Sequence, residues 1–228
     1  MRFAVSQSNY IPWIGYFDLI SQVDVFVIYD TVQYTKNDWR NRNRILSQAG
    51  PIWLTVPVNH QSSTQLINET LIANQKWQRK HWMSIEQSYK KSPFFEMYRS
   101  GIKVFYEQEW TLLSELNRYL ILHLVQLLGI ETKIICSSEL AHCGDKNLRL
   151  ISFAKQLDSN SYLSGPAAKS YIDLEKFKQS NIDINWIDYS GYEPYQQCFD
   201  GFVSNLSVLD LLFNIGPDAM NYLKRSTL

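Results

Sequence analysis

The order of patterns at the start of the chain constrains the fold more than any other feature. Residues 2–7 alternate apolar and polar side chains as a short strand does, and a helical pattern over 13–21 follows Pro12. Residues 25–29 then form an uninterrupted apolar run, Val-Phe-Val-Ile-Tyr. Such a run is typical of a parallel strand buried on both faces. Strand, helix and strand in this order predict a parallel pair with a right-handed crossover.

Strands and helices alternate again in the C-terminal half. Strands are predicted at 132–136, 161–164 and 182–187, separated by helices at 146–157 and 173–179, with further helices near 208–213 and 218–223. Between the two halves lie strands at 45–47 and 52–58, turned at 49–51, a third candidate at 66–72, and helices at 77–90, 94–107 and 112–128. We therefore predict one α/β domain over 1–228 with a Rossmann-like, doubly wound, mostly parallel sheet and a helical insertion at about 75–128.

Composition narrows the classes of function. Lys plus Arg equals Asp plus Glu at 22 each, so a general nucleic-acid-binding field is not expected. No run of eighteen apolar residues occurs, and the N-terminus lacks a signal-peptide pattern, so no membrane insertion is expected. The three cysteines, Cys136, Cys143 and Cys198, form no CxxC pair. A cytoplasmic protein without a bound metal is the resulting expectation.

Three predicted loops leave strands at one edge of the sheet, at 7–12, 30–44 and 164–168. Ligands of such sheets bind outside the carboxyl ends of the strands, so these loops form a composite candidate site. Aromatic residues reach 14% of the chain, with seven Trp and fourteen Tyr. Most of them are expected in the core, but such side chains also suit a pocket for sugars, bases or acyl groups.

Within the loop at 30–44, arginines at 40, 42 and 44 alternate with Asn41 and Asn43. In an extended segment, residues two apart share a face, so arginines would line one side and asparagines the other. Guanidinium forks recognise phosphate or carboxylate, and amides recognise hydroxyls or base edges. The alternative is a hydrated hairpin edge whose charges oppose aggregation.

A second group falls early in the helix predicted at 77–90. Lys80 and His81 are neighbours there, with Trp77 and Trp82 close by. A histidine that faces the site would be a suitable general base near neutral pH, whereas one that faces inward would be a structural residue. GxGxxG, P-loop, HExxH and GxSxG motifs are all missing from the sequence.

Several segments together resemble one family. They are 7–17 (QSNYIPWIGYF), 26–36 (FVIYDTVQYTK), 39–45 (WRNRNRI), the pair Lys80-His81, 162–165, 195–196 and 206–214. This pattern resembles the WbqC-like family over essentially the whole chain. The family usually reads Gln-Pro after the first strand, whereas this chain has Gln7-Ser8, so this loop is expected to differ in shape.

The resemblance implies a role in the biosynthesis of bacterial O-antigen, the surface polysaccharide part of lipopolysaccharide. It implies acyl or aminoacyl transfer to the amine of a nucleotide-linked amino sugar, from a phosphopantetheine-linked donor on a carrier protein, with no tightly bound cofactor. His81 or Asp30 would take the amine proton, and Lys36 and Arg42 would hold phosphates. The remaining substrate-binding residues would be polar groups and stacking walls: Gln7, Tyr10, Tyr16, Gln33, Trp39, Asn41, Asn43, Lys80, Ser164 and Gly165.

A more distant similarity connects the fold with nucleotidylyltransferases. Their HxGH motif opens the helix after the first strand, where this chain reads Trp13-Ile14-Gly15-Tyr16. Trp13 and Tyr16 replace the two histidines that would stabilise the transferring phosphates, which argues against nucleotidyl transfer. The same fold could still bind a different ligand. Two further alternatives are a non-catalytic binding protein of polysaccharide assembly and a glycosyltransferase. The second is weakened because the chain has no DxD motif.

Overall fold

The computed structural model, which describes residues 1–141 and 144–224, is organised around a five-stranded parallel sheet. The strands are β1 (Arg2–Ser6), β2 (Val25–Ile28), β7 (Lys133–Cys136), β8 (Ser161–Ser164) and β9 (Asp183–Trp186), in the order β7-β2-β1-β8-β9. The chain thus moves outward from β1 in one direction and then in the other. This confirms the predicted Rossmann-like α/β fold and places its switch point between β1 and β8.

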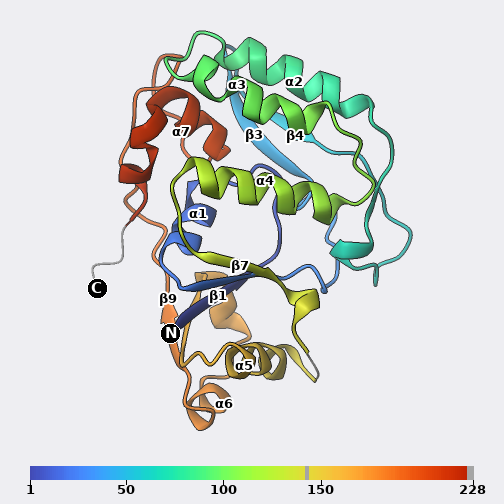
Figure 1. Cartoon of the computed structure of the whole chain (residues 1–228), viewed down its shortest axis with the longest axis vertical. Helices are drawn as coiled ribbons and strands as arrows, with labels where there is room; N and C mark the ends of the chain where they lie inside the picture. Colours follow the sequence, from blue (N-terminus) through green and yellow to red (C-terminus); the bar gives the residue numbers. More distant parts are fainter. Residues whose placement is uncertain (142–143, 225–228) are drawn as a thin grey trace.

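Helices cover both faces of the sheet. Phe3, Val25 and Val27 pack into a small core under α5 (Lys146–Gln156) and α6 (Leu174–Gln179), whereas Ala4 and Phe26 belong to the larger core on the opposite face. Figure 1 shows α5 and α6 below the sheet, with α1 (Ile14–Ser21), α4 (Leu113–Leu127) and α7 (Val208–Ile215) above it. The sequence of β2 is apolar throughout because helices cover both of its faces.

The long connection between β2 and β7 carries the predicted insertion. It contains an antiparallel hairpin of β3 (Arg42–Ser47) and β4 (Gly50–Thr55), a short pair of β5 (Val58–Asn59) and β6 (Leu71–Ile72), and helices α2 (Lys76–Tyr89), α3 (Phe95–Lys103) and α4. In Figure 1 the hairpin, α2 and α3 stack beyond α4. The strand predicted at 66–72 is instead a 3-10 turn, Ile67–Glu69, followed by β6.

The C-terminal segment is tied to the insertion by the buried carboxylate of Asp210 on α7. Tyr89 and Tyr195 donate their hydroxyls to it at 2.9 and 2.8 Å, and Gln197 donates an amide at 2.7 Å. The Tyr89 hydroxyl also accepts the backbone N–H of Leu46 at 3.0 Å. One carboxylate therefore joins α7, the 195–197 segment, α2 and the hairpin.

No helix in the described ranges is long and apolar enough to cross a membrane. Two of the three cysteines, Cys136 and Cys198, are free thiols. The third, Cys143, lies outside the described residues. The helix predicted at 218–223 is a 3-10 segment, Gly216–Tyr222, directly after α7.

Candidate functional site

A buried carboxylate marks the carboxyl edge of the sheet. Asp30 follows β2 and is only 7% exposed, and Ser8, in the loop after β1, donates its backbone N–H to it at 2.9 Å. The Ser8 hydroxyl donates to the same carboxylate. Burial raises the pKa of Asp30 above its ordinary value, while the Ser8 donors and the Arg40 charge oppose that rise. A carboxylate held in this way is a stronger base than an exposed one.

Arg40 supplies a cation beside this carboxylate. Its Nη1 donates to the side-chain oxygen of Asn9 at 2.7 Å, and its Nη2 lies 3.5 Å from a carboxylate oxygen of Asp38. The side chain is 16% exposed, and its buried Nε has no partner among the described residues. Burial lowers the pKa of Arg40, and Asp38, Tyr16 and Asp30 oppose the change. The guanidinium therefore places an incompletely partnered positive charge close to the Asp30 carboxylate.

Asn117 of α4 links the loop after β1 to the backbone of Arg40. Its side-chain nitrogen donates to the Ser8 hydroxyl at 3.2 Å and to the backbone carbonyl of Arg40 at 2.8 Å. The residue is fully buried, and its amide oxygen has no partner within the described part of the chain. We call Ser8, Asp30, Arg40 and Asn117 the edge cluster.

The rim of the edge cluster contains several of the predicted residues. Tyr16 donates its hydroxyl to the carbonyl of Gln7 at 3.1 Å. Burial raises the pKa of Tyr16 well above its ordinary value, and the charge of Asp30 adds to the rise. Ser164 ends β8 and Gly165 follows it, and a Cβ on Gly165 would lie 3.6 Å from the hydroxyl of Tyr189. The carboxyl ends of β1, β2 and β8 lie at one edge of the sheet, because β1 pairs in parallel with both of the other strands.

Gly15 has a packing role at the start of α1. A Cβ at this position would lie 2.3 Å from a ring carbon of Trp13, so only glycine lets the indole fold back onto the helix. Trp13 also makes edge contacts with Tyr189 and Tyr192, at 5.3 and 5.9 Å between centroids. The glycine that resembles part of an HxGH motif therefore makes room for an aromatic ring.

The asparagines predicted to bind substrate face inward instead. Asn41 is 6% exposed and donates to the carbonyl of Val56 at 2.8 Å, and Asn43 is 1% exposed and donates to the carbonyl of Ile11 at 2.8 Å. Ile11 has a φ of 38°, a left-handed conformation that is costly for a β-branched residue. Asn43 thus holds a strained turn of the loop after β1, and both amides position backbone.

His81 and Tyr10 also lie in the core. His81 is 6% exposed and Tyr10 is fully buried, and the Tyr10 hydroxyl lies 2.9 Å from Nδ1 of His81 and 2.9 Å from the hydroxyl of Tyr106. Trp77 packs against the imidazole with its ring centroid 5.1 Å away. We therefore reassign His81 from proton acceptor, and Tyr10 from stacking wall, to a buried aromatic cluster.

Acidification should destabilise the protein through His81. Burial lowers the pKa of His81 from 6.5 to about 4, so the unfolded chain binds a proton more readily in this range. Above pH 6.5 His81 is neutral in both states and does not reduce the free energy of unfolding. As the pH falls toward 4, the unfolded chain takes up the proton first, and the free energy of unfolding falls by about 3 kcal/mol at most. Urea unfolding from pH 7.5 to 4 measures it. His81→Gln should remove this component, and an unchanged pH slope in that variant would contradict the assignment.

The remaining predicted residues lie at the surface. Trp39 is 41% exposed, Gln33, Lys36 and Lys80 are also exposed, and Arg42 is half-buried. Arg42 and Arg44 share the outer face of the hairpin, as the alternation predicted. Arg40 does not join them, because β3 begins only at Arg42.

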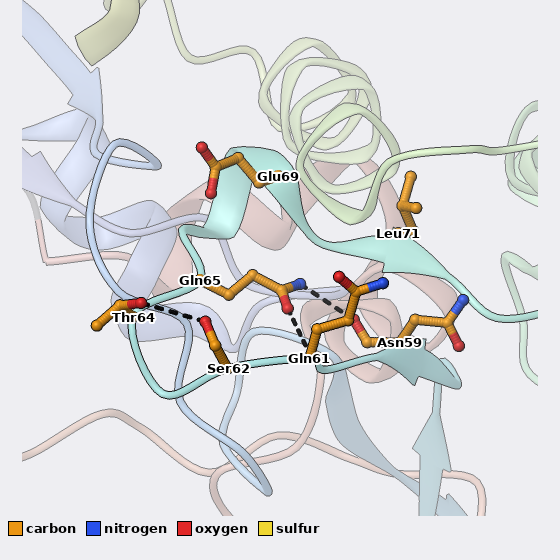
Figure 2. Close-up of a pocket in the computed structure, with 7 residues that line it drawn as sticks. All are labelled: Asn59, Gln61, Ser62, Thr64, Gln65, Glu69 and Leu71. Atoms are coloured by element: carbon orange, nitrogen blue, oxygen red, sulfur yellow. Dashed lines mark hydrogen bonds between the residues drawn. The ribbon is translucent and has the colours of Figure 1, made fainter.

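A shallow cavity of about 240 Å³ lies elsewhere, over the loop 59–71 (Figure 2). Gln65 accepts the backbone N–H of Gln61 at 2.8 Å and donates to the carbonyl of Asn59 at 3.0 Å. Ser62 and Thr64 bond to each other at 3.1 Å. These polar groups hold their own loop together, so the cavity offers few free partners to a ligand. Across residues 1–141 and 144–224, no three His, Cys, Asp or Glu side chains converge as a metal site requires.

Sequence reasoning missed part of the edge cluster. Asn117 carried a readable signal, since it is an amide at a core position of a leucine-rich helix, beside Leu113, Leu116 and Leu120. A polar residue on such a stripe needs a buried partner. Ser8 was noted only as a departure from the family pattern, and no signal identified its bonds with Asp30.

The five-stranded parallel sheet places the chain among Rossmann-like α/β proteins, and a buried carboxylate and guanidinium lie at the carboxyl edge of this sheet. Residues 7–222 match the model of the WbqC-like protein family, and the chain belongs to this family. It is 44% identical over 225 residues to a Mycobacterium tuberculosis protein named "Uncharacterized protein Rv1507c", and the match covers 98% of this chain and 97% of that protein. No solved structure matches the chain.

Proposed function

We propose that the protein is a cytoplasmic acyl- or aminoacyltransferase that acts on the amine of a nucleotide-linked amino sugar in bacterial O-antigen biosynthesis. One observation carries the proposal. A buried carboxylate with a raised pKa, Asp30, lies beside the incompletely partnered guanidinium of Arg40 at the carboxyl edge of the sheet. A base and an anion-binding group side by side are what acylation of an amine requires.

The proposed reaction uses both groups in one step. The sugar amine attacks the carbonyl carbon of a thioester carried on the phosphopantetheine of a carrier protein. A C–N bond forms, the C–S bond breaks, and the amine proton passes to Asp30. The thiolate leaves and takes up this proton from the Asp30 carboxyl group, which restores the carboxylate. Arg40 donates to the negative charge that develops on the carbonyl oxygen. The donor is a substrate in this scheme, and no cofactor stays bound.

A transfer assay tests the proposal. The protein is incubated with an aminoacylated carrier protein and a UDP-linked amino sugar, and mass spectrometry should detect a new amide on the sugar. The same nucleotide sugar with its amine acetylated should give no product. Arg79→Ala, a change on the exposed side of α2, should behave like the wild type. If no donor in a panel gives product although the nucleotide sugars bind, the protein is a binding protein of polysaccharide assembly.

A further inference from the structure

Two exposed indoles lie together beside the β3–β4 hairpin, with Trp53 on β4 and Trp39 in the turn before β3. Trp39 and Trp53 are 41% and 47% exposed, and their ring centroids are 5.6 Å apart with 36° between the planes. The protein buries other tryptophans, among them Trp77 and Trp110, to less than 8% exposure. Two neighbouring indoles left in solvent therefore form an unusual surface for this chain.

Two guanidinium groups complete this surface. Arg44 pairs directly across the hairpin with Trp53, and Arg42 lies two residues away on the same face. The guanidinium carbon of Arg42 lies 4.5 Å above the Trp53 ring, and that of Arg44 lies 5.7 Å away. Stacking on the indole orients both guanidiniums and lowers the entropy cost of using them. We call Trp39, Arg42, Arg44 and Trp53 the hairpin platform.

The charges of the hairpin platform are not neutralised. Arg42 donates to the backbone carbonyl of Asn37, and Arg44 donates to that of Asn205 at 3.3 Å. Neither has a carboxylate partner among the described residues, whereas Arg99 of α3 pairs with Glu86 at 2.8 Å. Two positive charges are therefore available to one anionic ligand.

We propose that the hairpin platform binds a nucleoside diphosphate, with the base stacked on Trp39 and Trp53 and the phosphates held by Arg42 and Arg44. Adjacent aromatic faces suit a planar base, and a pair of guanidiniums suits a diphosphate. Residue 39 directly precedes Arg40, so the platform borders the edge cluster. The inference deepens the proposed function, on which it rests: the platform would hold the nucleotide half of the sugar donor while the amine lies near Asp30.

Titration calorimetry with UDP, GDP and ADP tests the platform without any turnover. At least one of them should bind, and Trp53→Ala or Arg44→Ala should weaken its binding about tenfold or more. Trp53→Phe keeps an aromatic face and should retain most of the affinity. Controls are Tyr119→Ala and Arg79→Ala, which remove an exposed aromatic and an exposed arginine elsewhere, and both should bind as the wild type does. Because Trp53 is exposed, these variants should fold normally.

Three outcomes would overturn the inference: no binding of any of the three nucleotides at millimolar concentration, unchanged binding in both Trp53→Ala and Arg44→Ala, or tighter binding of a single-stranded oligonucleotide than of every nucleoside diphosphate. Failure of the proposed function would look different. Platform-dependent binding of a nucleoside diphosphate, together with no amide product from any donor, would support the platform and reject the transferase.

Discussion

Asp30→Asn should lower the rate of amide formation about 1000-fold, the usual contribution of a general base. The asparagine has nearly the same shape, so it can still accept the Ser8 N–H, but it has no basic oxygen to take the amine proton. The loss should appear in kcat under saturating substrate. Binding of UDP to the hairpin platform should stay unchanged, since none of the platform residues contacts Asp30. Single-turnover mass spectrometry with the transfer assay measures the effect.

Ser8→Ala should shift the pH dependence of transfer without removing the base. It removes the hydroxyl donor that lowers the pKa of Asp30, so the pKa of the carboxyl group should rise further. Transfer needs the carboxylate form, and the acidic limb of the pH–rate profile should therefore move to higher pH. A purely structural role for Asp30 would lower activity at every pH without moving this limb. Wild-type rates in Asp30→Asn would show that another group accepts the proton.

The fold was readable from the sequence because its strongest patterns have simple physical causes. The run at 25–29 is apolar on both faces because two layers of helices cover β2, and the stripe at 112–128 faces the larger core. Gly129 has a φ of 69° directly after α4, as a helix C-cap requires. The strand predicted at 66–72 failed because residues 67–69 form a 3-10 turn. Short apolar runs do not distinguish a strand from a turn.

Several residues of the predicted site have orientations that the sequence alone does not determine. Alternation showed that Asn41 and Asn43 share a face, yet it does not say which face is buried. That face is buried, so both amides donate hydrogen bonds to backbone carbonyls. The direction of His81 depended on the position of Tyr10, which is distant in sequence. Such long-range contacts leave no local signal.

The edge cluster also combines a residue that local sequence identifies with partners that it does not. Asp30 was selected because it follows a buried strand, a position set by local sequence. Its partners come from the loop after β1 and from α4, and only the folded chain brings Ser8 and Asn117 together, at 3.2 Å. The residue types predicted an anion site at this edge, whereas the groups that surround Asp30 are known only from the folded chain.

Asp210→Ala should lower the free energy of unfolding by about 4 kcal/mol, since each buried donor left unpaired costs about 1–3 kcal/mol. Three donors lose their acceptor at once, from Tyr89, Tyr195 and Gln197. Burial raises the pKa of Asp210, so its charge opposes folding and the stabilisation comes from the donors it satisfies. Urea unfolding at neutral pH measures the loss, and Asp218→Ala, an exposed aspartate nearby, should change it by less than about 0.5 kcal/mol.

The position of this carboxylate makes its loss a test of how the hairpin is held. Tyr89 also accepts the N–H of Leu46 in β3, so a weakened network should loosen the hairpin before the central sheet. Hydrogen exchange in Asp210→Ala should therefore accelerate over residues 42–55 and remain slow over β1 and β2. Tyr195→Phe removes one donor while keeping the carboxylate, and should cost about 1 kcal/mol. Uniform acceleration over both regions would mean that Asp210 stabilises the whole fold and does not anchor the hairpin in particular.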